Sequence, residues 1–416
     1  MKNIPTYEEA VALVNLPNSP FYESKSEING FRVSVFNYRL AQWSDFNAPG
    51  ALEMRGITYV FNADGTVYKV FPLLEKFFNL NQVPTTEYSA VKNFKIKSIY
   101  NKEDGSVASF IRLPDGTVFG KSKMSVITEQ AEGIMRVYRA NAAVRTFVDW
   151  TLDNDLTAVF EYVAPHNKIV LNYAKEDLIL LRLRDNLTGE LLDLNDYASM
   201  IGDLNVAKAE NEFTLDQLIE LAQFTEDKEG WIVEFENGLL MKVKTDWYFK
   251  LHGLLTEDLY KENVVIGYIL NDEIDDIIAQ IPVGDVAAHE RVNKLIDLVK
   301  REIEYKIADI KDSYERNYVT VGSRKEYALK FRKVDRNFAY VMKVVDGIEL
   351  AKMTIDEAIE AFETVEAYES AVKRCDVYEL AKNYISDRTK RLLIARDWLK
   401  SIDPTFFFID VDEVEA

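Results

Sequence analysis

A lysine beside a short acidic turn is the first candidate for chemistry in this sequence. Lys102 opens the tetrapeptide KEDG, and strand-like runs at residues 91–100 and 107–113 flank it. A lysine, a carboxylate and a glycine at a strand junction are suited to a covalent nucleotide-transfer site, in which the amine is the nucleophile. The same residues also fit an exposed polar turn, and this stretch alone leaves both interpretations open.

Two further lysines are placed to assist such a nucleophile. Lys242 and Lys244 stand two residues apart in a predicted strand, so both ammonium groups project from one face. A lysine amine has an ordinary pKa of about 10.4, and nearby cations or desolvation lower it. If this face looks toward Lys102, the pair would bind phosphate oxygens and favour the neutral Lys102 amine. The alternative is a pair of lysines on the solvent-exposed face of a hairpin.

Two glutamates are candidates for holding a divalent cation. Glu161 lies in the apolar run VFEYVA, and Glu229 precedes Gly230 just before the last predicted hairpin. Mg²⁺ favours a few oxygen ligands and retains waters, and it would stabilise charge on the α-phosphorus oxygens of a triphosphate. The alternatives are an outward position on an amphipathic strand for Glu161 and a place in an acidic turn for Glu229.

Other motifs are weaker or missing. Arg55 and Lys76 could clamp the outer phosphates, although both also fit ordinary surface charges. The sequence has no Gly-rich P-loop, and its three histidines show no metal-ligand spacing. A nucleotide would therefore be held by lysine, arginine and carboxylate side chains rather than by a phosphate-binding loop.

The composition limits the class of protein. The chain has 416 residues, of which 48% are hydrophobic, so it can form two or three domains with sizeable cores. Its net charge of -19 argues against indiscriminate polyanion binding, but it does not exclude a basic groove on an acidic body. A single cysteine excludes an internal disulfide. The N-terminus lacks a signal peptide, and no apolar run approaches the roughly 20 residues that cross a bilayer. A soluble intracellular protein is expected.

The secondary-structure signals change near residue 254. Before it, hairpins are predicted where Asp64-Gly65, residues 114–116 and Asn237-Gly238 follow strand-like runs, the last as a type I′ turn. The alternation of the strand at residues 31–38 slips at Phe36, where a bulge or an end is expected. A further strand is predicted at 169–173, and helices at 129–148 and 215–224.

Helix signals dominate the rest of the chain. Apolar residues at helical spacing predict one long helix over 289–314, a capping box at 354–357 predicts another long helix, and 382–400 also reads as helical. The acidic end at 409–415 is expected to be solvated. The predicted fold class is therefore α+β, with a mixed part of antiparallel sheets and helices at 1–254 and an all-helical part at 255–416.

The motifs together resemble a known family. KEDG is similar to the Lys-x-Asp-Gly signature of covalent nucleotidyltransferases, the superfamily of DNA ligases, RNA ligases and mRNA capping enzymes. The ordered set of FE, EG and KVK that follows it strengthens the match. The closest resemblance is to the bacteriophage RNA ligase 1 family, and it covers about residues 30–252. It is carried by ALEMRGI at 51–57, EKFFNLN at 75–81, KSK at 121–123, FEYVAP at 160–165, NKIVL at 167–171 and KTDWY at 244–248.

The resemblance implies a reaction. Lys102 would attack the α-phosphorus of ATP, the AMP would pass to an RNA 5′-phosphate, and a 3′-hydroxyl would then seal the strand. The implied cofactors are ATP and Mg²⁺, with Mn²⁺ as an alternative. The implied partner is RNA with 5′-phosphate and 3′-hydroxyl ends, in the family a nicked tRNA. A monomer is expected, in the cytoplasm, which would be the host's if the protein is phage-encoded.

The resemblance also assigns roles to residues. Asp104 would assist near the nucleophile, while Lys242 and Lys244 would contact the α-phosphate. The other implied roles are outer-phosphate contacts for Arg55 and Lys76, metal organisation by Glu161 and Glu229 with Tyr248 beside them, an adenine sandwich of Leu181 and Ile232, and nucleotide or RNA contacts for Lys121 and Lys123. The helical part would select structured RNA. Two alternatives stay open: another covalent nucleotidyltransferase, of DNA end-joining or capping type, and a non-catalytic nucleotide- or RNA-binding protein.

Overall fold

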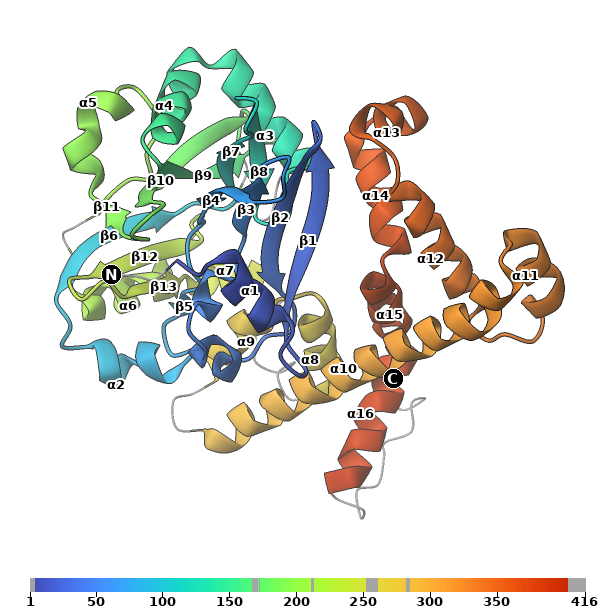
Figure 1. The fold of residues 1–416 in the computed structure, drawn as a ribbon. Coiled ribbons are helices and arrows are strands. Elements are labelled where there is room, and N and C mark those ends of the chain that lie inside the picture. Colours follow the sequence, from blue (N-terminus) through green and yellow to red (C-terminus); the bar gives the residue numbers. More distant parts are fainter. Residues whose placement is uncertain are drawn as a thin grey trace. The chain divides into compact units, whose positions relative to one another are not determined.

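The chain folds into two compact units, Met1–Leu254 and Leu255–Ala416. The structure is a computed structural model, and it describes residues 4–166, 171, 173–210, 213–251, 261–281 and 285–402. The first unit contains three sheets and the second is helical (Figure 1). Antiparallel sheets with helices followed by a helical region confirm the predicted α+β class. Most of the predicted strand at 169–173 and the acidic end at 409–415 lie outside the described residues.

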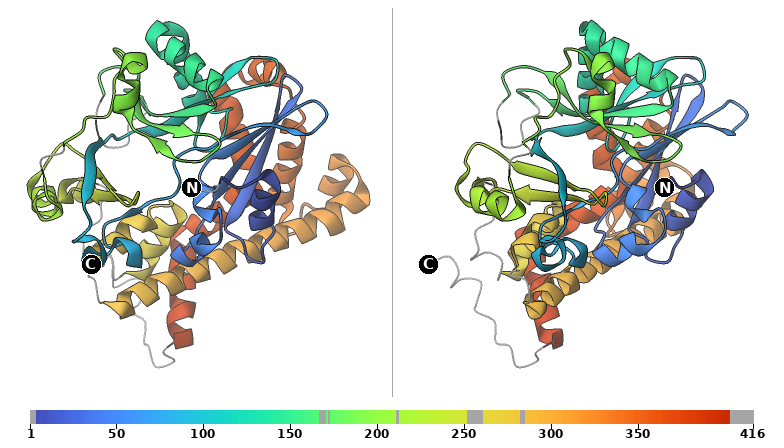
Figure 2. Two further views of the ribbon diagram at one scale, coloured as in Figure 1. Left: turned by 60° about the vertical axis from the view of Figure 1, so that its left-hand side comes forward. Right: turned by 90° about the vertical axis from the view of Figure 1, so that its left-hand side faces the viewer.

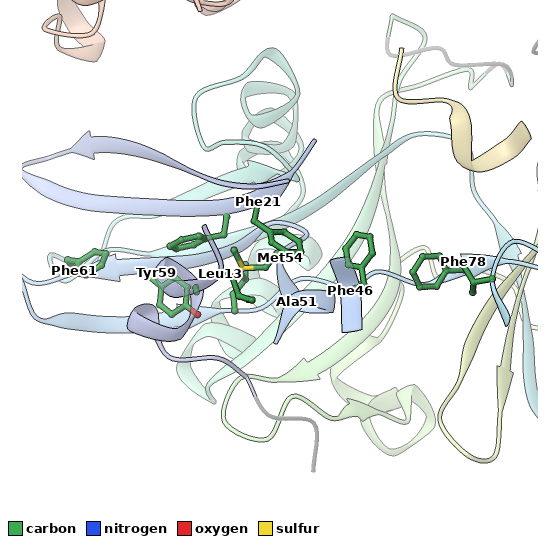
Figure 3. Packing of buried hydrophobic residues seen from close by; sticks show 12 residues of the cluster. Leu13, Phe21, Phe46, Ala51, Met54, Tyr59, Phe61 and Phe78 are labelled. Atoms are coloured by element: carbon green, nitrogen blue, oxygen red, sulfur yellow. The ribbon is translucent and has the colours of Figure 1, made fainter. Parts of the chain in front are cut away.

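The first sheet lies near the N-terminus. Its order is β1-β2-β3-β4, and its strands are β1 Phe21–Ile28, β2 Phe31–Tyr38, β3 Ile57–Phe61 and β4 Val67–Phe71. Helix α1, Tyr7–Val14, begins at a capping box formed by Thr6 and Glu9. Its apolar residues pack with those of the sheet around edge-to-face aromatic rings (Figure 3). The expected bulge at Phe36 was wrong, because β2 pairs with β1 in register from end to end and is buried on both faces.

The second sheet has the order β11-β10-β9-β7-β8. Its strands are β7 Ser106–Arg112, β8 Val118–Ser122, β9 Leu156–Val163, β10 Asp177–Asp185 and β11 Leu191–Leu192. The helix predicted at 129–148 is in fact two helices, α3 Glu129–Ala140 and α4 Ala142–Asp153. The reason is Asn141, whose extended backbone ends α3 and whose side chain caps α4 by accepting from the N–H groups of Ala143 and Val144.

The third sheet has the order β5-β13-β12-β6. Its strands are β5 Phe78–Asn79, β6 Ile96–Lys102, β12 Gly230–Phe235 and β13 Leu240–Lys244. One face packs on helix α6, Leu215–Phe224, through residues that alternate along the strands, including Ile99, Val233 and Val243. Because the period of a strand is two, the residues between them point to the opposite face. Figure 2 shows the sheets of this unit from two further sides.

The turn between β12 and β13 differs from the predicted type I′. A type I′ turn needs positive φ at both central residues. Here only Gly238 has it, at 84°, and Asn237 does not. The Phe235 N–H donates to the Leu239 carbonyl and the Gly238 N–H to the Phe235 carbonyl, so the loop has three residues with glycine in the left-handed position.

Short helices complete the first unit. Among the described residues they are α2 Tyr88–Val91, α5 Ala198–Ile201, α7 Asp246–Leu251 and short 3₁₀ segments at Trp43–Asn47, Ala51–Glu53, Pro84–Thr86 and Leu194–Tyr197. Within the described residues, no helix has both the length and the apolar character that crossing a membrane requires.

The described residues of the second unit form helices and the turns between them. The helices are α8 Glu262–Leu270, α9 Ile274–Gln280, α10 Val286–Ser313, α11 Arg324–Phe331, α12 Phe338–Leu350, α13 Ile355–Phe362, α14 Val365–Cys375, α15 Val377–Ser386 and α16 Arg388–Ile402. A π-helical turn, Tyr314–Val319, follows α10. Two predicted helices are shorter than expected: α13 ends before Glu363, whose φ is positive, and Asp387 separates α15 from α16.

Candidate active site

The register of the third sheet brings the predicted lysines to one face. Gly230 pairs with Lys102 on β6 and with Lys244 on β13. Two residues further along β12, Ile232 pairs with Tyr100 and with Lys242. These two rows of paired residues lie two positions apart along each strand. Because the period of a strand is also two, their side chains all point to the same face, opposite the face that packs on α6.

Glu229 links the two lysines of the first row. Its Oε2 accepts from Lys102 Nζ at 2.7 Å, and its Oε1 lies 3.2 Å from Lys244 Nζ. The Glu229 side chain is 3% exposed, whereas that of Lys102 is 21% exposed. Water is therefore largely excluded from the carboxylate, and one buried anion holds the amine of Lys102 in a defined place.

A cavity of about 430 Å³ opens in front of this face. The third sheet contributes Tyr100, Lys102, Ile232 and Lys242 to its wall, and the second sheet contributes Glu161 on β9 and Leu181 on β10. Leu181 is the extra residue of a bulge, where the pairing shifts between Leu180 and Arg182. The cavity thus has apolar side chains suited to a flat base and cationic side chains suited to phosphates.

Gly105 joins the nucleophile strand to the second sheet. Its N–H donates to Glu161 Oε1 at 3.1 Å. A Cβ at this position would lie 2.4 Å from the Tyr162 carbonyl oxygen and 3.1 Å from Glu161 Cγ. The last residue of KEDG is therefore glycine because β9 passes too close for a side chain.

We expect Gly105→Ala to destabilise the protein by about 3 kcal/mol, because an added methyl must push β7 from β9. Gly116→Ala is the control, since its methyl would meet no atom within 4 Å and only its φ of +89° is strained. That strain is expected to cost roughly 1 kcal/mol. Urea unfolding measures both, and an equal cost for the two variants would contradict the close approach at Gly105.

Glu161 is a buried carboxylate with a shifted proton affinity. Burial raises the pKa of Glu161 to about 7, against the nearby Lys102 cation, and Glu229 adds to the rise. The carboxylate is thus protonated over part of the neutral range and ionises more readily when a cation is brought beside it.

This raised pKa predicts a pH-dependent stability. The folded-state pKa of about 7 lies above the ordinary value of 4.5, so Glu161 favours folding below about pH 4.5 and loses this contribution as the pH rises through 7. Glu161→Gln should remove this loss, so at about pH 8 the free energy of unfolding of the variant should exceed that of the parent by up to about 3 kcal/mol. Chemical unfolding in the presence of a chelator at about pH 5 and about pH 8 tests this, with exposed Glu132→Gln as the control. Parallel pH profiles for the parent and both variants would contradict it.

Asp104 lies beside the nucleophile but is engaged elsewhere. Its Oδ1 accepts from the Tyr248 hydroxyl at 3.0 Å and its Oδ2 from the Leu171 N–H at 2.6 Å. Its own N–H donates to the Tyr173 hydroxyl, which also donates to Glu103. Asp104 is therefore positioned to hold the loop after Lys102, and Tyr248 reaches this loop through Asp104. The place of Tyr248 beside a metal ion stays a prediction.

The four remaining predicted cations occupy different surroundings. Arg55 and Lys123 line the cavity, and Arg55 Nη1 donates to the Leu74 carbonyl. Lys76 is buried with its Nζ between 5.2 and 5.9 Å from the rings of Tyr38, Phe46 and Phe78. Within the part of the chain that is described, Lys76 is not among the residues that line the cavity, so its predicted phosphate contact has no support from this geometry.

Lys121 is the least accessible of the predicted site residues. Its side chain is completely buried, its Nζ donates to the Gly56 carbonyl at 2.9 Å, and burial lowers the pKa of Lys121 to about 7. Instead of reaching a nucleotide or RNA, this amine fixes the backbone next to Arg55. These contacts do not support the predicted substrate contact of Lys121, which stays a prediction.

Sequence reasoning missed part of the cavity wall. Tyr100 lies under the guanidinium of Arg182, whose Cζ is 3.6 Å from the ring centroid. Phe77 lies 5.1 Å below Lys242 Nζ. Strand alternation from Lys102 could have identified Tyr100, but Arg182 enters the cavity through the bulge in β10, which alternation does not predict.

The donor set fits a divalent cation that keeps most of its waters. Glu161 and Glu229 are two buried carboxylates whose charges interact. No group of three or more His, Cys, Asp or Glu residues placed to hold a metal occurs within the described ranges. Two carboxylates together with waters and phosphate oxygens match the way Mg²⁺ binds beside nucleotides.

Comparisons with known proteins show that this chain is similar to RNA ligases. Residues 53–254 match the family described as RNA ligase, and this segment contains all the predicted site residues. A protein of Thermovibrio ammonificans named "Putative RNA ligase" is 26% identical over 361 residues, which is 80% of this chain and 87% of that protein. Residues 53–254 are thus similar to the RNA ligase family, and this similarity confirms the predicted resemblance to the bacteriophage RNA ligase 1 family.

Solved structures show more distant similarity. An archaeal ATP-dependent RNA ligase, form 2, is 12% identical to this chain with a TM-score of 0.45. The match covers 73% of this chain and 80% of the archaeal chain. A mutant of Naegleria gruberi RNA ligase with AMP and Mn is 14% identical with a TM-score of 0.35, covering 43% of this chain and 57% of its own.

Proposed function

We propose that the protein is an ATP-dependent RNA ligase that joins a 5′-phosphate to a 3′-hydroxyl through a lysyl-AMP on Lys102. The observation that carries the proposal is the row of Lys102, Glu229 and Lys244, in which Glu229 contacts both lysines and Lys102 lines a cavity with apolar and cationic side chains. It supports nucleophilic transfer because the amine is fixed beside both a proton acceptor and a second cation.

In the first step Lys102 Nζ attacks the α-phosphorus of ATP. A nitrogen–phosphorus bond forms, the bond to the β-phosphate oxygen breaks, and pyrophosphate leaves. Glu229 Oε2, 2.7 Å from Nζ, is placed to accept the ammonium proton beforehand. Lys244 then retains a cation beside the developing phosphate charge, and Lys242 and Arg55 line the phosphate end of the cavity.

The AMP is next transferred to an RNA 5′-phosphate, which forms a pyrophosphate linkage and frees Lys102. A 3′-hydroxyl then attacks the RNA phosphorus, the new phosphodiester forms, and AMP leaves. Glu161 and Glu229 would hold a divalent cation, Mg²⁺ or Mn²⁺, which supplies charge neutralisation on the phosphate oxygens when bound. Leu181 and Ile232 bracket the adenine, as their place in the cavity wall supports.

The second unit, Leu255–Ala416, would select structured RNA, and a nicked tRNA is the proposed substrate. This part of the proposal rests on the family resemblance and on the nucleotide cavity, whose lining residues all belong to the first unit.

Sealing assays test the function directly. The purified protein is incubated with ATP and Mg²⁺ and with a 5′-phosphorylated RNA strand, and circular or joined RNA is expected. Parallel reactions replace ATP by GTP, and RNA by DNA of the same sequence. Product with GTP alone would favour a capping-type enzyme, product with DNA alone a DNA end-joiner, and no product together with nucleotide binding a non-catalytic protein.

A further inference from the structure

A basic hairpin stands out on the second unit of this acidic protein. We define it as residues 323–337, which include helix α11. Its cations are Arg324, Lys325, Lys330, Arg332, Lys333 and Arg336. Against them stand only Glu326 and Asp335, so six positive and two negative charges give a net +4 in a chain of net -19. Helix α11 follows the C-terminal end of α10 (Figure 1).

An aromatic and polar cluster holds the basic hairpin rigidly. Tyr327 is fully buried, with ring centroids 5.5 Å from Phe331 and 5.1 Å from Phe338. Its hydroxyl donates to Asp335 Oδ2 at 2.8 Å, and Asn317 Nδ2 donates to the same oxygen at 2.8 Å. One carboxylate thus joins helix α11 to the π-helical turn that follows α10, and this network fixes the backbone that carries the surface charges.

Half of the cations are available to a partner. Arg324 pairs with Asp346, Arg336 with Asp309 and Lys330 with Glu326. Lys325, Arg332 and Lys333 are exposed, and no ion pair is recorded for them among the described residues. The nearby side chains of Leu329 and Val334 are 78% and 74% exposed. The surface therefore combines unneutralised cations with apolar area suited to the sugars between phosphates.

A second run of cations, on α16, is used inside the unit. Lys390 Nζ donates to the Tyr384 hydroxyl at 3.1 Å and lies 4.7 Å from its ring centroid. Arg391 packs against α8, where its Nη1 would lie 2.7 Å from a Cβ on Gly267. Lys390 and Arg391 thus pack against other parts of the unit, whereas Lys325, Arg332 and Lys333 of the basic hairpin are exposed.

We propose that the basic hairpin docks the phosphate backbone of the RNA substrate. This inference rests on the proposed RNA ligase function and names a surface of the second unit, distinct from the residues that line the nucleotide cavity, that would bind the RNA. RNA is the partner that the charges favour, because a net acidic protein needs a local concentration of fixed, unpaired cations to attract a polyanion.

The test uses the full-length protein and a 5′-phosphorylated RNA hairpin as the probe. The variant carries Lys325→Gln, Arg332→Gln and Lys333→Gln. The matched control carries Lys294→Gln, Lys352→Gln and Lys373→Gln, three exposed helical-unit positions outside the basic hairpin that change the net charge equally. Fluorescence anisotropy measures Kd at several salt concentrations, and thermal unfolding checks that both variants are folded.

We expect the hairpin variant to bind RNA at least about tenfold more weakly, and the slope of log affinity against log salt to fall by about 2. The control should bind as the parent does. Equal affinities and slopes for both variants would overturn the inference and leave the basic hairpin as a surface for an acidic protein. AMP attachment to the parent, followed by mass, separates this outcome from failure of the proposed function itself.

Discussion

Lys102→Ala is expected to abolish attachment of AMP to the protein. Incubated with ATP and Mg²⁺, the parent should gain the mass of one AMP, while the variant should gain none, a rate loss of more than about 10³-fold. The reason is that the Lys102 amine, which lines the cavity and is held by Glu229 at 2.7 Å, is the proposed nucleophile, and alanine has no amine. Intact-mass measurement gives the result without an RNA substrate.

Two further variants separate the nucleophile from its charge. Lys102→Arg keeps a cation beside Glu229 but replaces the amine by a guanidinium that stays protonated, so it should also fail to gain AMP. Lys95→Ala removes an exposed lysine near the start of the same strand and should behave as the parent. An AMP adduct on Lys102→Ala, or none on the parent over a range of metal and pH, would exclude the lysyl-AMP mechanism.

Glu229→Ala is expected to damage both stability and reaction. It would leave Lys102 and Lys244 without their shared carboxylate, and breaking a buried pair by removing one partner costs about 3 kcal/mol. The freed Lys102 amine would no longer be held in place, and misplacement of this kind slows a reaction on the order of 10²-fold. Urea unfolding and the rate of AMP attachment measure the two effects.

Glu236→Ala is the matched control. Glu236 also pairs with a lysine on the neighbouring chain segment, Lys95, but both side chains are more than half exposed. Exposed pairs contribute at most about 1 kcal/mol, so this variant should be nearly as stable as the parent and attach AMP at the same rate. If the two glutamate variants lost equal stability, Glu229 would not be the buried link between the lysines.

Local patterns predicted much of the secondary structure. The capping box at Thr6, the hairpins at Asp64-Gly65 and after Arg112, and the helix Leu215–Phe224 all form where the residues indicate. The errors have local causes of a different kind. Asn141 and Asp387 divide predicted helices because side-chain and backbone preferences at one residue outweigh apolar periodicity that continues on both sides.

The site was predictable in its residues but not in its contacts. Spacing places Lys242 and Lys244 on one strand face, and strand alternation could also have added Tyr100. Nothing local shows that Glu229 accepts from Lys102, because that contact depends on pairing between β6 and β12, 127 residues apart in the chain. The sequence also could not predict the burial of Lys76 and Lys121. Lysines are mostly exposed in proteins, and these two are buried because elements distant in the chain enclose them.

By itself, the sequence determined the resemblance to the RNA ligase family, the α+β class and the ordered set of motifs that begins with Lys102. These properties depend on residue types and their spacing, which are the same whether or not the chain is folded. The tertiary structure decided which of these residues are in contact. Gly230 pairs with both Lys102 and Lys244, the Tyr248 hydroxyl donates to Asp104, and Lys121 is buried against the Gly56 carbonyl. The physical reason is that sheet register and burial arise from long-range packing, which no short motif contains.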